Sequence, residues 1–282
     1  MVNQIKTLIM KNKILVYDDN CPLCTWYSGL FVKYGFLNAD GRKPFSTLDD
    51  ILLAKIDFDK SRNEIPLLDT STHKVVYGID ALLEILDQKI PFIKAIGDFA
   101  PLKWVLKKIY KLVSFNRKVI VTKKCRPATI DCSPDYNYLY RFIFMAVCLT
   151  FNTLMLYPFQ YYLFSKLSYY HLDLYELQAA HFAFVIINCM LAFSFPKAKG
   201  YDYLGQVNML ALTVILLLIP LMIIQFIFDS ELLATAWLIL TALFIFKEYI
   251  RRMEYAGILL NNKWIVSMNL LSLTGFILFL FH

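Results

Sequence analysis

Charged residues and histidines are scarce in this sequence. Asp, Glu, Lys and Arg together make up 18% of the 282 residues, hydrophobic residues make up 58%, and there are four histidines. Soluble proteins carry about 25% charged residues, so we expect part of the chain to lie in lipid. The sequence also has no phosphate-binding glycine loop, no hydrolase triad and no paired histidines for haem. These absences disfavour the corresponding classes of enzyme.

The N-terminus lacks the small-residue cleavage site of a secretory signal peptide. Lys6, Lys11 and Lys13 surround a short apolar stretch at residues 8–10, and no such site follows, so we expect no secretory signal. The six cysteines are too few and too scattered for a disulfide scaffold, and the closely spaced pairs are expected to be reactive or metal-binding. The cysteines are Cys21, Cys24, Cys125, Cys132, Cys148 and Cys189.

Charge is distributed unevenly along the chain. The long uncharged runs fall almost entirely after residue 138, whereas the first third has an ordinary charge density. This contrast predicts a soluble domain over residues 1–122, a cysteine-containing linker over 123–137 and a transmembrane helical domain over 138–282. The net charge is +7, and Lys and Arg cluster between Lys103 and Arg141, directly before the first apolar run. This placement favours a membrane surface and argues against nucleic acid.

Five apolar stretches are long enough to cross a hydrocarbon core of roughly 30 Å, which needs about 20 residues. The fourth is short, which leaves four or six spans as alternatives. Basic residues flank alternate ends of the stretches, and the intervening loops are poor in them. The positive-inside rule then predicts a multi-pass inner-membrane protein with its N-terminal domain in the cytoplasm and His282 outside. The five stretches are residues 138–163, 177–195, 207–228, 232–246 and 264–281.

A pair of cysteines lies at a predicted strand-to-helix junction. The apolar run 14–17 ends at Asp18, then Cys21 and Cys24 follow in a Cys-x-x-Cys spacing, and apolar residues recur at helical spacing over 25–37. The free N–H groups and the dipole of a helix N-terminus stabilise a thiolate, so Cys21 is the expected nucleophile. Cys24 lies one turn later and is the expected resolving thiol.

A Cys-x-x-Cys pair can also form half of a zinc site, and Cys125 and Cys132 offer a second pair. The position at a helix start, with no nearby histidine, favours redox chemistry for Cys21 and Cys24. For Cys125 and Cys132 three interpretations stay open: a second dithiol exchanging with Cys21, half of a metal site, or two unrelated loop cysteines.

Two further cysteines fall inside predicted spans. Cys148 and Cys189 are expected at a similar depth, about 10 Å inside the cytoplasmic boundary, on adjacent antiparallel helices. This placement permits a redox relay. A pair of small buried apolar residues is the simpler interpretation.

A proline-led hairpin and a helix follow the dithiol helix. Pro66 begins the first hairpin strand, and Asp80 opens a helix over 81–86. In thioredoxin and glutaredoxin folds a cis-proline begins such a hairpin and packs against the dithiol, so Pro66 is the candidate for it. An ordinary trans edge-strand proline is the alternative. The order of elements predicts a thioredoxin-like α/β domain followed by an all-α transmembrane domain.

These residues resemble the DCC thiol-disulfide oxidoreductases, a family named for an Asp-Cys-Cys pattern after the first strand. The similar motifs lie at residues 17–24, 77–82 and 101–117, the last with an Asn-Arg ending, and the resemblance covers roughly residues 12–120. It implies disulfide exchange with an unknown partner. Asp18 would bridge the turn or assist proton transfer to the buried thiol, and capping of the helix is the alternative.

The sequence departs from that family at Asp19, where the family usually has glycine. A second acid beside the dithiol is expected to raise the pKa of Cys21.

The sequence therefore predicts a membrane-anchored thiol-disulfide oxidoreductase that acts through Cys21, Cys24, Asp18 and Pro66. We expect a protein or small-thiol partner and the lipid bilayer, with no cofactor and no nucleic acid; no oligomeric state is indicated. One alternative is a non-catalytic membrane adaptor or assembly subunit that uses the fold as a binding surface. The other is a metal sensor with the ligands Cys21, Cys24, Cys125 and Cys132.

Overall fold

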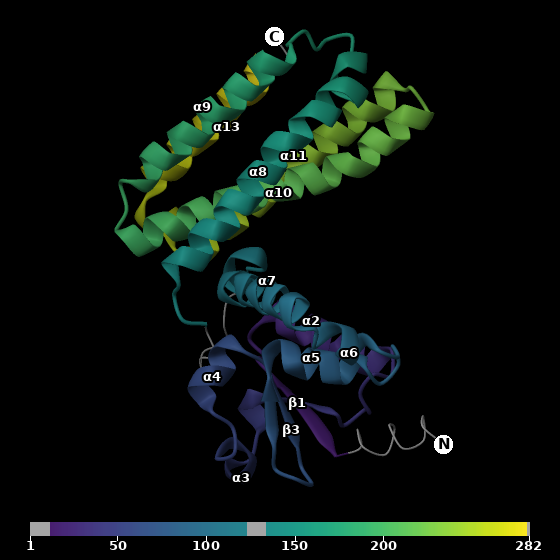
Figure 1. Cartoon of the computed structure of the whole chain (residues 1–282). Helices are drawn as coiled ribbons and strands as arrows, with labels where there is room; N and C mark the ends of the chain where they lie inside the picture. Colours follow the sequence, from purple (N-terminus) through teal and green to yellow (C-terminus); the bar gives the residue numbers. More distant parts are fainter. Residues whose placement is uncertain (1–11, 123–133, 281–282) are drawn as a thin grey trace. The chain divides into compact units, whose positions relative to one another are not determined.

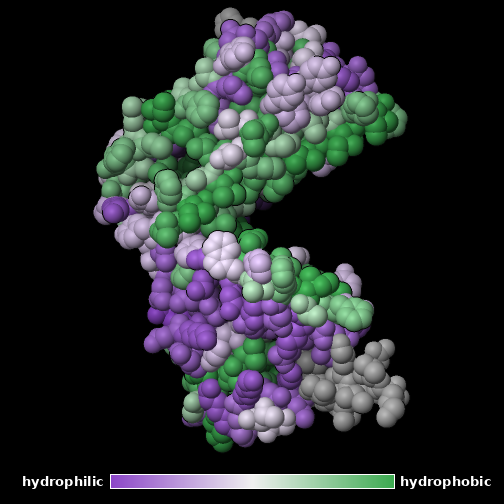
Figure 2. All heavy atoms as spheres, in the orientation of Figure 1, coloured by the Kyte–Doolittle hydropathy of each residue, from purple (hydrophilic) through white to green (hydrophobic). Residues whose placement is uncertain are grey.

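The computed structural model of the chain describes residues 12–122 and 134–280 (Figure 1). It divides into two compact units, with the boundary between Tyr140 and Arg141. Hydrophilic side chains cover much of the visible face of the N-terminal unit, and hydrophobic side chains dominate that of the C-terminal unit (Figure 2).

A four-stranded sheet forms the centre of the N-terminal unit. The strand order is β2-β1-β3-β4. Strand β1 (Lys13–Tyr17) runs parallel to β2 (Arg42–Pro44) and antiparallel to β3 (Pro66–Asp69), which pairs antiparallel with β4 (Val75–Tyr77). Strand β1 therefore lies inside the sheet, and β2 and β4 form its edges.

Helices and short helical turns complete the N-terminal unit. Helix α2 follows β1 directly, and the long helix α7 closes the unit. The elements are α2 (Pro22–Lys33), η1 (Phe45–Thr47), α3 (Asp50–Leu53), α4 (Phe58–Asn63), α5 (Gly78–Leu86), α6 (Ile93–Gly97) and α7 (Ala100–Ile120).

The apolar core of this unit lies on both faces of β1. Leu15 and Val16 point to opposite faces of the sheet and are both fully buried. Leu15 belongs to a cluster that includes Cys21 and Cys24, whereas Val16 packs with Phe45 on the other face. The dithiol is thus part of the core layer formed with α2.

The prediction of a thioredoxin-like α/β domain is wrong. The structure is 72% helical and contains a small four-stranded sheet rather than a full thioredoxin-like α/β domain. The strand-forming runs are short, because the β-branched and apolar residues of each are soon followed by polar or turn residues. The strands are accordingly three to five residues long. The remaining sequence has helical periodicity and forms helices.

The prediction of a cis-proline at Pro66 is also wrong, since no peptide bond is cis in the described residues. Pro66 begins β3 and pairs with Tyr77 of β4. The N–H of the preceding Ile65 donates to the Tyr110 hydroxyl at 2.9 Å, and its carbonyl accepts from Gly78 N at 2.9 Å. The extended trans backbone satisfies both groups of Ile65.

The C-terminal unit is an assembly of long apolar helices. In the described part of the chain, four helices are long and apolar enough to cross a membrane, and this makes the chain a membrane protein. These are α8 (Tyr138–Tyr162, continued to Lys166 by η2, Phe164–Lys166), α9 (Leu174–Ala192), α10 (Lys197–Ile227) and α11 (Glu231–Tyr255). The short helix α12 (Ile258–Asn261) leads into α13 (Lys263–Leu280).

Four of the five predicted stretches form helices of spanning length in the described residues, which agrees with the four-span alternative. The fifth stretch forms α13, which belongs to the shorter apolar helices. A helix of about 17 residues covers about 26 Å, less than the thickness of a typical hydrocarbon core.

Several polar groups inside the C-terminal unit are paired with one another, whereas the Asn152 amide has no hydrogen-bond partner among the described residues. The Arg252 guanidinium donates to Gln206 and to Glu248, each at 2.8 Å. The Tyr203 hydroxyl donates to Asn188 at 2.7 Å, and Asn269 donates to the same Asn188 oxygen. Such pairing is needed because unsatisfied polar groups are costly away from water.

We expect Leu15→Ala to destabilise the N-terminal unit by about 2–5 kcal/mol, because it removes a fully buried side chain from the strand inside the sheet. Urea-dependent proteolysis of the full-length protein in detergent would measure the loss. Ile51→Ala is the control: Ile51 is 73% exposed, so its change should stay within about 0.5 kcal/mol. Equal effects of the two substitutions would contradict this core.

Candidate active site

The turn after β1 presents Cys21 as the first residue of a helix. Asn20 N donates to Asp18 Oδ1 at 2.9 Å, and Cys21 N donates to the Asp18 carbonyl at 3.2 Å, so both bonds hold the turn together. Cys21 is the N-cap of α2, with extended backbone angles, and Pro22 occupies the first helical position, which needs no N–H donor. The predicted strand, turn and helix are all present.

The Cys21 sulfur accepts a hydrogen bond from the backbone of Cys24. The distance from Cys24 N to Cys21 Sγ is 3.4 Å. The thiol thus takes the place of the oxygen that usually caps a helix, and an N–H dipole points at the sulfur. Both residues are buried, with exposures of 8% for Cys21 and 4% for Cys24.

A buried ion pair lies beside the two thiols. Arg117, on α7, has its Nη2 3.2 Å from Asp18 Oδ2, and the two side chains are 9% and 10% exposed. The pair joins the turn after β1 to a helix about 100 residues later in the chain. Because both charges are removed from water, each depends on the other for stabilisation.

The two cysteines differ in acidity. The hydrogen bond from the Cys24 thiol lowers the pKa of Cys21 to about 7; burial opposes this shift, Arg117 supports it and Asp18 weakens it. The same hydrogen bond, together with burial, raises the pKa of Cys24. Near neutral pH Cys21 therefore has substantial thiolate character, whereas Cys24 holds its proton.

Asp19 does not have the effect expected from the sequence. Its position predicts a raised pKa for Cys21, yet that pKa is lowered. The Asp19 carboxylate accepts a hydrogen bond from Ser46 at 2.9 Å in an exposed position. Burial raises the pKa of Asp18, Arg117 opposes that shift, and the negative charge of Asp19 adds to it. Asp19 thus raises the pKa of Asp18 and is not among the causes that shift the pKa of Cys21.

Aromatic residues line the buried surroundings of the dithiol. Burial raises the pKa of Tyr27, and nearby Cys24 adds to the shift. Burial also raises the pKa of Tyr110, whose hydroxyl accepts from the Ile65 N–H. These phenols stay neutral at physiological pH and add no charge near the thiols. The positive charge that acts on the thiols is that of Arg117.

Sequence reasoning missed the role of Arg117. The Asn-Arg ending of the third motif is visible in the sequence, but only as part of a resemblance. A physical signal exists in the spacing: Tyr110, Ser114 and Arg117 recur at three- and four-residue intervals, as expected for one face of a helix. A basic residue in line with a buried face indicates a buried charge that needs a partner.

The structure does not give a functional role to the other residues singled out in the sequence. Cys125 and Cys132 lie outside the described residues. In ranges 12–122 and 134–280 no group of three or more His, Cys, Asp or Glu side chains could hold a metal ion. Cys148 is buried on α8 and Cys189 is half-buried on α9, both as free thiols. A role for Pro66 in catalysis stays a prediction.

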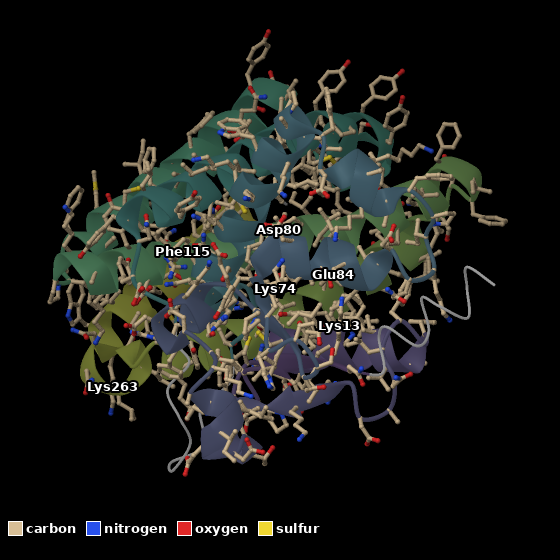
Figure 3. All side chains as sticks on the ribbon, turned by 60° about the horizontal axis from the view of Figure 1, so that its bottom comes forward. Lys13, Lys74, Asp80, Glu84, Phe115 and Lys263 are labelled. Carbon is tan, nitrogen blue, oxygen red and sulfur yellow. The ribbon has the colours of Figure 1, made fainter. Side chains whose placement is uncertain are left out.

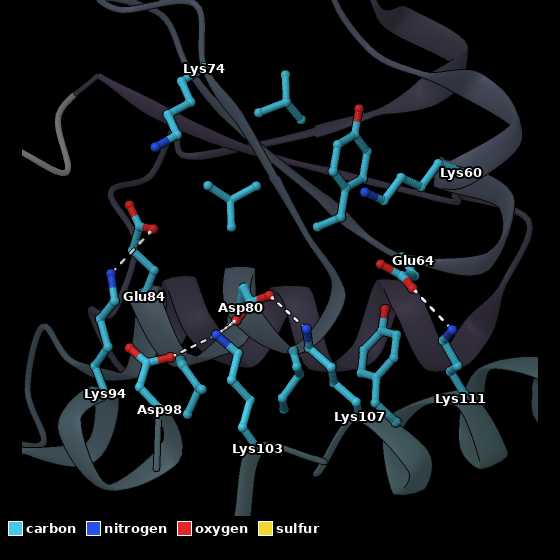
Figure 4. A pocket seen from close by; sticks show the side chains of 16 residues that line it. Lys60, Glu64, Lys74, Asp80, Glu84, Lys94, Asp98, Lys103, Lys107 and Lys111 are labelled. Atoms are coloured by element: carbon cyan, nitrogen blue, oxygen red, sulfur yellow. Dashed lines mark hydrogen bonds and ion pairs between the residues drawn. The ribbon is translucent and has the colours of Figure 1, made fainter. Parts of the chain in front are cut away.

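A second feature of the N-terminal unit is a cleft of about 590 Å³ between the edge strand β4 and helices α5 and α7. At one end of it Glu84 pairs with Lys13 of β1 and, at 3.8 Å, with Lys94 (Figure 3). The cleft holds six lysines and four carboxylates (Figure 4). The lysines are Lys60, Lys74, Lys94, Lys103, Lys107 and Lys111, and the acids are Glu64, Asp80, Glu84 and Asp98.

Ion pairs neutralise much of the charge in this cleft. Lys103 lies 2.6 Å from Asp80 and 2.9 Å from Asp98, and Lys111 lies 3.9 Å from Glu64. The pairs attach α7 to α5, to Asp98 after α6 and to Glu64 at the end of α4. These ion pairs give the cleft a structural role, and Cys21 and Cys24 are the candidate active site.

No protein-family model, curated protein or solved structure matches the chain. The resemblance to the DCC family stays a prediction from the motifs.

We expect Arg117→Gln and Asp18→Asn to shift the pKa of Cys21 in opposite directions. Loss of the positive charge raises that pKa, so less thiolate is present at pH 7 and alkylation of Cys21 slows by about tenfold. Loss of the negative charge lowers the pKa and speeds alkylation below pH 7. Iodoacetamide labelling of the full-length protein as a function of pH, with Cys21 followed by peptide mass spectrometry, measures both effects.

Lys118→Gln is the matched control, since it removes the same charge one position along α7. It should leave the alkylation profile centred on about pH 7. The double variant Asp18→Asn/Arg117→Gln removes both buried charges. It leaves no unpaired buried charge and can therefore be measured even if a single variant does not fold. If Arg117→Gln and Lys118→Gln behaved alike, the buried ion pair would have no part in the acidity of Cys21.

Proposed function

We propose that the chain is a membrane-anchored thiol-disulfide oxidoreductase that exchanges disulfides through Cys21 and Cys24. The observation that supports this most directly is the Cys21 sulfur, which accepts the Cys24 N–H at a helix start. Its pKa of about 7 is about two units below the usual value. A second thiol of higher pKa one turn later is the arrangement needed for a resolving cysteine.

The proposed exchange has two steps. The Cys21 thiolate attacks one sulfur of a partner disulfide, the partner's other sulfur leaves as a thiolate, and a mixed disulfide forms. Cys24 then loses its proton, attacks Cys21 Sγ and releases the remaining partner sulfur as a thiolate, which takes up a proton. The protein gains a Cys21–Cys24 disulfide, and the partner disulfide gains two electrons and two protons. The reverse sequence oxidises a partner dithiol.

Two neighbours have supporting roles in this scheme. Arg117 stabilises the thiolate that forms first at Cys21 and then on the leaving sulfur. Asp18 is the proposed proton acceptor for Cys24, because its carboxylate lies in the same buried region as that thiol and burial raises its pKa. The partner is a protein or a small thiol, and nucleic acid has no place in the scheme.

We place the N-terminal unit in the cytoplasm and the anchor in the inner membrane. The support is the distribution of Lys and Arg, which are dense before α8 and in the last turns of α11 and sparse between α8 and α9. Four spans return the chain to the side on which it started. The prediction that His282 lies outside therefore requires α13 to cross as well.

We expect full-length protein to show a reversible two-electron couple when titrated against glutathione or dithiothreitol buffers. Peptide mass spectrometry would follow the thiol state of Cys21 and Cys24, in a Cys125→Ser/Cys132→Ser background. Cys21→Ser should abolish exchange with a model disulfide, and Cys24→Ser should accumulate the mixed disulfide, since the resolving step is lost. Cys148→Ser, on α8, is the control and should leave the couple unchanged.

Two results would count against this function. A dithiol that no buffer oxidises would favour the adaptor, which uses the domain only as a binding surface. Stoichiometric zinc in the purified protein, lost in Cys21→Ser and in Cys125→Ser, would favour the metal sensor.

A further inference from the structure

Large apolar side chains gather on the surface of the N-terminal unit over α6 and α7 (Figure 2). Phe92 is 74% exposed, Phe99 65% and Trp104 64%. Ile96, Ile109 and Val113 are exposed as well. We call these six residues the α6–α7 patch. Single exposed apolar residues are ordinary on a soluble surface, but a group of this kind marks an interaction site.

Part of the patch lies on a helix whose inner face holds the site. Tyr110, Ser114 and Arg117 face the core of the unit. At about 100° per residue, Trp104 and Ile109 lie roughly 80–140° from these three around the helix axis, on its two exposed sides, and Val113 lies next to Arg117. Helix α7 thus exposes apolar side chains on more than one side, which the described residues of its own unit leave uncovered.

Phe92 is held in an unfavourable backbone conformation. Its φ is +68°, in the left-handed region that residues with a side chain rarely adopt. Phe92 also precedes the first residue of α6 and has no side-chain capping bond. The strain holds a phenylalanine ring out in solvent, where it gains nothing from burial. Strain of this kind is found where a surface is used.

The charge on α7 has one sign. Helix α7 contains five lysines and one arginine, and no Asp or Glu. Lys103 and Lys111 pair with acids of the cleft, and Lys107 lies 3.7 Å from Asp80. Lys107 and Lys108 are nevertheless exposed beside the patch. Lys108 lies over the Trp104 ring, with 5.6 Å from its Nζ to the ring centre. Apolar and aromatic side chains bordered by lysines are the pattern of a helix that lies in the plane of an anionic membrane surface.

The C-terminal end of α7 contacts the beginning of the first span. The Phe115 ring stacks on Tyr140, with 5.1 Å between ring centres, and Asn116 Nδ2 donates to the Tyr140 carbonyl at 3.1 Å. Tyr140 belongs to the first turn of α8, which begins at Tyr138. A helix that starts to cross the bilayer there brings the end of α7 to the headgroup region.

We propose that the α6–α7 patch docks on an anionic phospholipid surface, with α7 lying along the bilayer. The rings of Phe92, Phe99 and Trp104 enter the boundary between headgroups and acyl chains. The exposed Lys107 and Lys108 contact the phosphates. This role is independent of the thiol chemistry proposed above.

A second copy of the chain fits the patch less well. In a two-fold dimer the same surface meets itself, so the exposed Lys107 and Lys108 of one copy would face those of the other. Like charges at close range oppose such packing, whereas anionic lipid compensates them.

The test compares two tryptophans of equal exposure in the full-length protein. Trp104 is 64% exposed in the patch and Trp26 is 63% exposed on α2. The protein is placed one copy per nanodisc, in phosphatidylcholine alone or with 30% phosphatidylglycerol, and oxidised with hydroxyl radicals. Peptide mass spectrometry then gives the oxidation rate of each residue. With anionic lipid, Trp104 should oxidise about fivefold more slowly than Trp26, and Phe92 and Phe99 about fivefold more slowly than they do in phosphatidylcholine alone.

The variant Lys107→Glu/Lys108→Glu should restore oxidation of Trp104 in the anionic discs. Lys33→Glu/Lys74→Glu changes the net charge equally at exposed positions outside the patch and should leave the protection in place. Cys21→Ser should keep the protection too, which separates this proposal from thiol exchange. Equal oxidation of Trp104 and Trp26 in anionic discs would overturn the proposal. Protection that is the same in both lipids would overturn anionic lipid as the partner.

Discussion

The buried ion pair between Arg117 and Asp18 is the interaction on which the N-terminal unit depends most. It connects the turn after β1 to α7, and it puts the positive charge beside Cys21 and Cys24. Without Arg117, a carboxylate and a thiolate would share one buried region with no compensating charge. The pair thus combines two tasks: it attaches the last helix to the turn after β1, and its two charges adjust the pKa of Cys21, which the hydrogen bond from Cys24 lowers most.

Local features of this unit could be predicted from the sequence because neighbouring residues determine them. The apolar run before Asp18, the proline after Cys21 and the helical spacing that follows suffice to place the dithiol at a helix start. Features that depend on distant residues could not be derived in this way. The effect of Asp19 was wrongly predicted because the hydrogen bond from the Cys24 thiol, supported by the distant Arg117, lowers the pKa of Cys21. The geometry of Pro66 likewise depends on Tyr110.

The helices of spanning length, too, could be predicted from neighbouring residues, whereas the fold class, which depends on the whole domain, was predicted wrongly. Hydropathy identified the apolar stretches, and four of them form helices of spanning length. The fifth has the right composition but forms a shorter helix, and composition alone does not measure length. A thioredoxin-like domain was inferred from the order of motifs, which carries no information on how many residues each strand contributes. The observed strands are short, and helices account for most of the structure.

The hydrogen bond from Cys24 N to Cys21 Sγ has a consequence for the energetics of oxidation. A helix cap contributes about 1 kcal/mol, and here the cap is a sulfur that bears its full negative charge only in the reduced protein. Part of the capping energy of α2 is therefore lost when Cys21 enters a disulfide. For a two-electron couple 1.4 kcal/mol corresponds to about 30 mV, so the start of one helix contributes on the order of 20 mV to the reduction potential. The reduced protein is favoured by that amount, and the first turn of α2 becomes part of the proposed redox centre.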